Sequence, residues 1–316
     1  MTYLLFAVWF VLLIKWADLL TDWASSIAKK FWLSSLVIWL TIVAFGTSLP
    51  EFVVSSLASF SWNNEIAFAN ILGSNVANIF LVLWIAWLIR TLKVESSTVY
   101  KEIPFALLTM LMLWAFVFDK FLNGQSENIL TRWEGISLLL VFVIFLYYTF
   151  WISKNHSEED WVVQEFSVLK SIIFILLWFT WLVLWWKWIV EWAVLIAQNF
   201  WLSEALIWSS IIAIWTSLPE VAASWMAAYK WKTSMAVWAV VGSNIFNVAW
   251  VLWANAVILP VAYSETLNLD IFFSVWATIL LFIFMFIWKK HQLCKWQAAL
   301  FLLIYLVYLF FVTLRG

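Results

Sequence analysis

The chain has 316 residues, of which 66% are hydrophobic and 11% are charged, and its formal net charge is −1. A soluble domain carries about a quarter charged residues, so this composition excludes a soluble globular protein and indicates one embedded in a lipid bilayer. The near-neutral charge offers no basic field for nucleic acid. The single cysteine, Cys294, excludes a disulfide framework, and with His156 and His291 in polar segments a His/Cys metal cluster is excluded as well.

Apolar runs of membrane-spanning length, about 20 residues, recur from end to end. In chain order they predict ten spans, near 3–21, 33–60, 65–89, 103–118, 134–153, 168–190, 202–228, 234–260, 270–288 and 296–313. The longest hydrophilic break, residues 154–167, divides five spans from five. We therefore predict an all-α polytopic membrane protein with five helices in 1–153, a cytoplasmic linker at 154–167 and five helices in 168–316.

Lysine and arginine predict the orientation, because cytoplasmic loops carry an excess of both. Most of the 17 lie in loops on the side opposite the N-terminus, whereas Lys15, Lys120, Arg132, Lys187 and Arg315 lie on the N-terminal side. We expect a multi-pass protein of the cell inner (plasma) membrane with both termini outside the cytoplasm.

The two halves carry an internal repeat. Residues 22–80 align with 191–249 without a gap, and the signature segments are 32–80 and 201–249. GTSLPE at 46–51 meets WTSLPE at 215–220, and GSN at 73–75 meets GSN at 242–244. Because five is an odd number, equivalent spans cross the membrane in opposite directions. Inverted repeats with a binding site near the midplane are a design of secondary transporters.

Each copy of the repeat places one glutamate, Glu51 or Glu220, in the middle of an apolar span. A carboxylate at that depth is costly and is normally functional. Two-fold pairing of the halves would bring both carboxylates together, where they would repel each other unless a cation or a proton neutralised them. Oxygen ligands without His or Cys favour Ca²⁺, Na⁺ or similar cations over Zn²⁺ or Cu²⁺.

Further oxygen atoms accompany the glutamates. Pro50 and Pro219 each precede a glutamate and free the carbonyl four residues back, either as a cation ligand or as part of a packing kink. Hydroxyl groups lie one turn away, and Ser–Asn pairs spaced by four residues share one face of each third span. These polar groups either bind a cation or join helices; they are Thr47, Ser48, Thr216, Ser217, Ser74, Asn78, Ser243 and Asn247.

At GTSLPE…GSNVAN and TSLPE…GSNIFN, the sequence resembles the bacterial type of the sodium/calcium exchanger family, within the calcium/cation antiporter superfamily. The resemblance implies exchange of Ca²⁺ for Na⁺ by alternating access, with the ions as substrates and no cofactor. It also implies a ligand set: Glu51, Glu220, Thr47, Ser48, Thr216, Ser217, Ser74, Asn78, Ser243 and Asn247, with backbone carbonyls of Ala44 and Ala213. Some relatives carry an aspartate at one of the two asparagine positions. With both neutral here, the number of coupled Na⁺ ions stays open.

Other functions are weighed against this one. A proton-coupled or K⁺-dependent Ca²⁺ exchanger would use the same glutamates. A cation channel would need a continuous pore with a selectivity filter, and no such pattern occurs in the sequence. A membrane enzyme using the glutamates as an acid/base pair would need a nucleophile–base set, which is also missing. We expect a transporter rather than an enzyme, monomeric in the lipid bilayer and without nucleic-acid partners.

The tryptophan content is anomalous, with 29 Trp against 6 Gly. In the repeat, Gly46 of one half faces Trp215 of the other within identical TSLPE flanks. Other tryptophans stand where the family's pattern has glycine, namely Trp32, Trp39, Trp62, Trp201, Trp208, Trp231, Trp238 and Trp250. If most Trp were Gly, glycine would rise to about a tenth of the chain, an ordinary value for a membrane protein. We hypothesise that the source organism reads UGA as glycine.

Overall fold

The computed structural model describes residues 34–60, 64–153, 166–177 and 213–315, together with the isolated positions 15, 19, 22, 23, 26, 27, 30, 31 and 180. Most of the predicted spans at 3–21 and 168–190, and the first part of that at 202–228, lie outside these residues. The predicted linker at 154–167 lies almost wholly outside them too.

The regular secondary structure of the described part is helical apart from four strands of two residues each. The first half contains α2 (Ser35–Ile38), η1 (Trp39–Val43), α3 (Ala44–Thr47), α4 (Leu49–Phe60), α5 (Asn64–Ala77), η2 (Asn78–Val82), α6 (Leu83–Ile89), β1 (Leu92–Lys93), η3 (Thr98–Glu102), α7 (Ile103–Phe116), α8 (Asp119–Asn123), β2 (Ile129–Leu130) and α9 (Arg132–Ser153). The second contains α12 (Ala213–Thr216), α13 (Leu218–Tyr229), α14 (Thr233–Phe246), η5 (Asn247–Leu252), α15 (Trp253–Ile258), β3 (Val261–Ala262), η6 (Glu265–Leu267), α16 (Asn268–Phe284), β4 (Gln292–Leu293) and α17 (Lys295–Arg315).

Six continuous helices of the described part are long and apolar enough to cross a membrane. They are Asn64–Ile89, Thr98–Phe116, Arg132–Trp151, Thr233–Ile258, Glu265–Phe284 and Lys295–Arg315. A seventh span forms if Leu36–Thr47 and Leu49–Phe60, which meet at an angle of 43°, count as one. These spans match the predicted ones, and the helical class of the fold is confirmed.

Two spans begin five residues earlier than predicted. The span predicted at 270–288 begins at Glu265, and the span predicted at 103–118 begins at Thr98. The predicted span began after Lys101 and Glu102 because both are charged residue types. In the structure, however, Glu102 is buried and accepts a hydrogen bond of 2.9 Å from the Tyr148 hydroxyl. A partner on another helix therefore allows a charged residue type inside the span.

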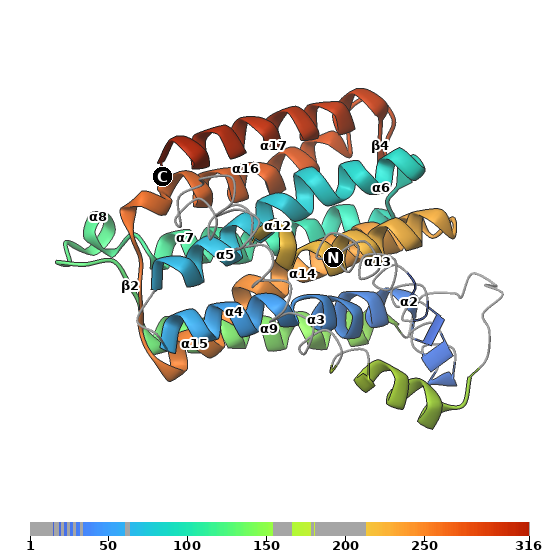
Figure 1. The fold of residues 1–316 in the computed structure, drawn as a ribbon, viewed down its shortest axis with the longest axis horizontal. Helices are drawn as coiled ribbons and strands as arrows, with labels where there is room; N and C mark the ends of the chain where they lie inside the picture. Colours follow the sequence, from blue (N-terminus) through green and yellow to red (C-terminus); the bar gives the residue numbers. More distant parts are fainter. Residues whose placement is uncertain are drawn as a thin grey trace, which may run out of the picture.

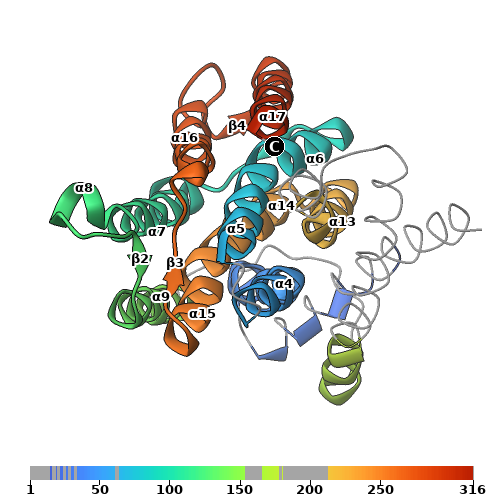
Figure 2. The same ribbon diagram turned by 60° about the vertical axis from the view of Figure 1, so that its left-hand side comes forward.

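Two helices form the centre of the bundle (Figures 1 and 2). The Thr233–Ile258 helix is 94% buried over its apolar window and the Asn64–Ile89 helix 72%, whereas the other four long helices are 28–44% buried. Helices that are apolar all round and buried all round belong to a core, and the less buried ones present one side to lipid. The repeated GSN motifs lie on these two central helices.

Two short antiparallel pairings join the halves. Strand β1 pairs with β4, with Leu92 opposite Leu293, and β2 pairs with β3, with Ile129 opposite Ala262. The two pairings lie at opposite ends of the molecule (Figure 1). Each half thus contacts the other at both ends of the bundle, as well as through the central helices.

Candidate functional site

The two TSLPE segments break their helices at the same place. In the first, α3 ends at Thr47 and α4 begins at Leu49; in the second, α12 ends at Thr216 and α13 begins at Leu218. The prolines Pro50 and Pro219 are the second residues of the new helices, a position where the missing N–H is tolerated. The proline break predicted from the sequence is confirmed for both segments.

The breaks place the two glutamates in the first turns of α4 and α13. Both side chains are 0% exposed. Oε1 of Glu51 accepts a hydrogen bond of 2.9 Å from the Ser74 hydroxyl. Among the described residues, Oε2 of Glu51 and both oxygens of Glu220 have no hydrogen-bond donor. A buried carboxylate without a partner costs several kcal/mol when ionised, so the site calls for a cation or a proton.

Hydroxyl groups from both halves surround the glutamates. Besides donating to Glu51, Ser74 lies 3.0 Å from the hydroxyl oxygen of Ser217. The hydroxyls of Thr47 and Ser243 are also 3.0 Å apart. Each of these pairs joins the TSLPE segment of one half to the GSN segment of the other. The predicted residues of the two motifs therefore form one buried cluster.

Four asparagines lie between the two central helices, and their hydrogen bonds fix the orientation of each amide. The side-chain nitrogens of Asn75 and Asn244 donate to each other's backbone carbonyls, at 3.4 and 3.2 Å. Their side-chain oxygens therefore face the other way: Oδ1 of Asn244 accepts from Asn78, and Oδ1 of Asn75 accepts from Asn247, at 3.0 Å in each case. Because those two amides use their nitrogens, their Oδ1 atoms remain buried, with no donor among the described residues.

Six of the buried oxygens without donors among the described residues belong to predicted ligand residues: three carboxylate oxygens, the two asparagine Oδ1 atoms and the hydroxyl oxygen of Ser48. Others, such as Oε2 of Glu102 and Oδ1 of Asn64, belong to residues that were not predicted as ligands. A buried acceptor without a donor is unusual in proteins. Carboxylate, amide and hydroxyl oxygens are the ligands that Ca²⁺ and other hard cations prefer. The arrangement can therefore hold a hard cation at the centre of the bundle.

The backbone carbonyls of Ala44 and Ala213 are the other two predicted ligands. The Ala44 carbonyl already accepts the backbone N–H of Ser48 at 3.0 Å and the Thr47 hydroxyl at 3.3 Å. Ala213 is the first residue of α12, and the residues before it are outside the described part. A ligand role for either carbonyl stays a prediction.

Asn70 belongs to the cluster but was not among the predicted site residues. Its side chain donates to the Glu51 backbone carbonyl at 3.3 Å and to the Ser55 hydroxyl at 3.0 Å, and accepts from the Thr216 hydroxyl at 3.3 Å. Its spacing could have indicated it, because Asn70 lies four residues before Ser74 and therefore on the same helix face. The second copy of the repeat has Ala239 at the matching position, so residues shared by both copies do not include it.

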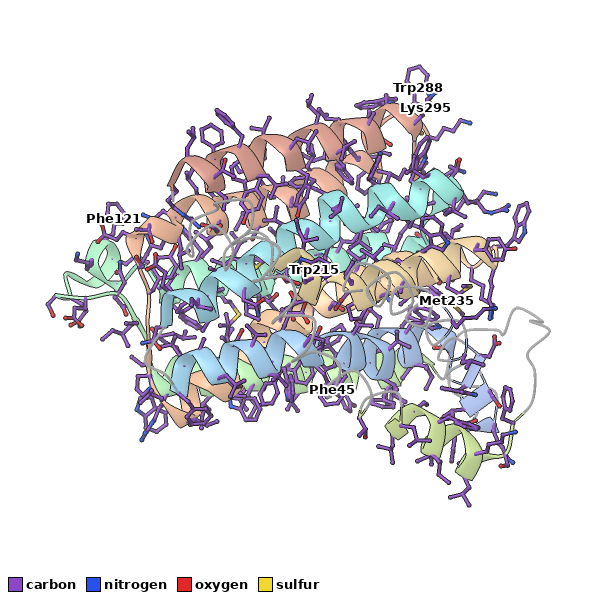
Figure 3. All side chains as sticks on the ribbon, in the orientation of Figure 1. Phe45, Phe121, Trp215, Met235, Trp288 and Lys295 are labelled. Carbon is purple, nitrogen blue, oxygen red and sulfur yellow. The ribbon has the colours of Figure 1, made fainter. Side chains whose placement is uncertain are left out.

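Trp215 lies beside this cluster. It directly precedes Thr216 in α12 and is half-buried, whereas Gly46 at the matching position is buried. Figure 3 places Trp215 in the middle of the molecule, among the central helices. A large side chain thus stands where the other half has no side chain at all.

Comparisons with known proteins agree with this chemistry. Residues 1–151 and 170–314 match the family described as Sodium/calcium exchanger protein. CaxA of Alkalimonas amylolytica is 33% identical over 258 residues, which cover 79% of this chain and 78% of that protein. The inner membrane protein YrbG of Escherichia coli K12 is 30% identical over 280 residues, covering 84% of each chain. The solved structure of the sodium-calcium exchanger NCX_Mj soaked with 10 mM Na⁺ and zero Ca²⁺ has a TM-score of 0.79 at 27% identity, covering 97% of this chain and 98% of that one.

Proposed function

Since the chain belongs to the sodium/calcium exchanger family, in its bacterial type, we propose that it exchanges Ca²⁺ for Na⁺ across the membrane by alternating access, with Glu51 and Glu220 as the central ligands. The members of this family are membrane antiporters and not enzymes. The ions are the substrates, and the proposal requires no cofactor.

One observation carries the proposal: three carboxylate oxygens of Glu51 and Glu220 are buried without a donor among the described residues, in a cluster without a cationic side chain. Among the described residues, neither glutamate forms an ion pair with Lys, Arg or His. With both carboxylates ionised, the cluster carries a charge of −2, which a divalent ion or two monovalent ions neutralise. One Ca²⁺ and two Na⁺ carry the same charge, so either can neutralise the two carboxylates. The ions then compete for the same oxygens, which is the basis for exchange.

We further propose ten membrane helices in two inverted repeats of five. Matching contacts support this. The Ser55 hydroxyl donates to the Ala67 carbonyl at 3.3 Å, and at the matching positions Ser224 donates to Ala236 at 3.2 Å. The reciprocal bonds of Asn75 and Asn244 join residues 169 apart, the spacing between the two copies of the motif.

The strand pairings support inversion in particular. β1 and β3 hold matching places in the two halves, as do β2 and β4. The pairing of β1 with β4 nevertheless lies at one end of the molecule and that of β2 with β3 at the other (Figure 1). Matching segments at opposite ends are what two oppositely oriented halves require.

The orientation proposed from the sequence puts the β1–β4 end in the cytoplasm. Basic residues gather in its loops. Hydrogen bonds from side-chain hydroxyls join those loops: the Lys93 carbonyl accepts from the hydroxyls of Thr233 and Ser234 at 3.2 Å. Both termini then face away from the cytoplasm. Because one chain supplies both halves of the cluster, we propose that a monomer suffices for exchange.

Transport into proteoliposomes tests the function. Vesicles loaded with Na⁺ and diluted into Na⁺-free buffer containing Ca²⁺ should accumulate Ca²⁺, and collapsing the Na⁺ gradient should stop uptake. Both the printed sequence and the same chain with Trp215→Gly are tested, because Gly46 is the matching residue in the first half. If neither form takes up Ca²⁺ under any gradient, the antiport proposal is refuted.

The same vesicles distinguish the coupling ion. We expect a Na⁺ gradient to drive uptake at equal pH on both sides, and a pH gradient without Na⁺ to drive none. Uptake driven by the pH gradient alone would replace Na⁺ with H⁺ as the exchanged ion. A requirement for K⁺ in addition to Na⁺ would indicate K⁺-dependent exchange.

A further inference from the structure

Two tryptophans have a backbone conformation that suits glycine. Among the described residues, three that are not glycine have a positive φ: Trp231 at 66°, Trp288 at 71° and His291 at 56°. In this left-handed region Cβ approaches the following carbonyl oxygen. Asn, Asp and His are enriched there among side-chain-bearing residues, and a bulky residue is an outlier. Glycine adopts the conformation without that clash.

The turn at Trp231 is a helix end that normally uses glycine. Helix α13 ends at Tyr229, and the N–H of Trp231 bonds to the Ala228 carbonyl at 3.2 Å while the N–H of Lys232 bonds to the Ala227 carbonyl at 2.8 Å. These two bonds with a left-handed residue between them make the Schellman motif, whose left-handed position is most often glycine. The backbone around Trp231 therefore has a recognised glycine geometry.

Neither side chain gains contacts that offset its conformation. Trp231 is 76% exposed and Trp288 is 78% exposed. The Arg90 guanidinium carbon lies 2.8 Å from the centre of the Trp231 ring, as a cation–π contact. Such a contact is weak at an exposed site and does not require a left-handed backbone.

An aromatic belt at the membrane surface explains exposed tryptophans in general, and Figure 3 shows Trp288 at the outer end of the bundle beside Lys295. A belt, however, needs only a ring at the right depth, which a right-handed backbone supplies equally well. Trp133, in α9, is 79% exposed in a helical conformation. The belt therefore leaves the positive φ at 231 and 288 unexplained.

Buried tryptophans give an independent sign of the same substitution. The indole N–H groups of Trp39 and Trp87 are buried with no acceptor among the described residues, although a buried indole N–H usually finds one. Trp39 is also 0% exposed within the irregular helix η1. Glycine at such a position has no indole N–H to satisfy.

We infer that positions 231 and 288 carry glycine in the protein as its own cell makes it, so that a codon read as tryptophan in the printed sequence is decoded there as glycine. The mismatch of Gly46 with Trp215 belongs to the same pattern. This inference does not depend on which ions the protein transports.

Mass spectrometry of the protein purified from the cells that carry the gene tests the inference directly. Fragmentation across residues 229–233 and 286–290 should give the mass of a glycine residue at 231 and at 288, with UGA at both codons. A tryptophan mass or a UGG codon at either position would overturn the inference.

A stability measurement gives a second test in the printed sequence. Trp231→Gly and Trp288→Gly should each raise the thermal unfolding midpoint, by about 2 °C. Trp133→Gly is the matched control, equally exposed but helical, and should not raise it. No rise in either variant, or an equal rise in the control, would contradict a glycine backbone at 231 and 288.

Discussion

Glu220 and Asp270 are both buried carboxylates of the second half, but their surroundings differ. Asp270 is 1% exposed; it accepts a hydrogen bond of 2.7 Å from the Tyr308 hydroxyl on one oxygen, and Arg315 pairs with the other. Glu220 is 0% exposed, and neither oxygen has a donor among the described residues. The protein thus neutralises Asp270 with its own groups, and we propose that it leaves Glu220 for a transported ion.

Glu102 is intermediate between the two. One oxygen accepts from Tyr148, and the other has no donor in the described part of the chain. Tyr148 and Glu102 join the fourth and fifth predicted spans of the first half much as Tyr308 and Asp270 join the corresponding spans of the second. Burial alone therefore does not identify a functional carboxylate. We propose that the lack of any donor among the described residues, on both oxygens, distinguishes Glu220 from Asp270 and Glu102.

The largest expected effect is at the central glutamates. Glu51→Gln or Glu220→Gln removes a charged ligand of the same size, and Na⁺-driven Ca²⁺ uptake should fall at least about 100-fold, since interactions with a charged ligand are worth a few kcal/mol. The folded protein should remain, because a neutral amide is easier to bury than an unpaired carboxylate. Glu65→Gln, at the exposed start of α5, is the control and should transport normally. Normal transport by either central variant would remove the ligand claim.

The ion pair of Arg315 and Asp270 should show the opposite behaviour, because its loss should affect stability and not transport. Arg315→Gln leaves Asp270 with only the Tyr308 hydroxyl, and the free energy of unfolding should fall by about 2 kcal/mol. This is below the range for a fully buried pair because the Arg315 side chain is 20% exposed. The Ca²⁺ concentration for half-maximal uptake by the folded protein should not change. A large shift in that concentration would make Asp270 part of the transport site.

A smaller change is expected at the asparagines. Asn78→Asp converts an amide oxygen without a donor into a third charged ligand, and we expect Ca²⁺ to bind about tenfold more tightly, or 1.4 kcal/mol. Asn75→Asp is the matched control, because the side chain of Asn75 is already bonded at both ends. Equal effects of the two changes, measured by the Ca²⁺ dependence of uptake, would argue against Asn78 as a ligand.

The smallest effect is expected for Tyr148→Phe. The change removes one hydrogen bond from Glu102 and should lower the free energy of unfolding by about 1 kcal/mol. Thermal unfolding in detergent measures it, and Tyr147→Phe, on an exposed residue of the same helix, should have no effect. A loss of transport without a loss of stability would assign Glu102 a role in the exchange itself.

Repetition and spacing made much of the cluster predictable from the sequence. Glu51 and Glu220 stand out because a carboxylate in an apolar span occurs twice in the same motif. Ser74 and Asn78 follow from their spacing of four residues. Asn70 was missed because the other half has Ala239 there, so repetition gives no signal.

Other features depend on contacts between distant segments and cannot be read from one sequence. Oδ1 of Asn78 has no donor among the described residues because of the bonds that Asn75 and Asn244 make across the two halves. The start of the span Thr98–Phe116 depends on Tyr148, a residue of the next span. In both cases a partner far along the chain decides which polar group can be buried.

Equilibrium Ca²⁺ binding to the purified protein tests the role of the central glutamates most directly. Isothermal titration of the detergent-solubilised chain with glycine at position 215 should show one Ca²⁺ site that Na⁺ competes for. Glu51→Gln or Glu220→Gln should abolish that binding, while Arg315→Gln should leave it intact. Unchanged Ca²⁺ binding in both glutamate variants would contradict the proposal that these two carboxylates hold the ion.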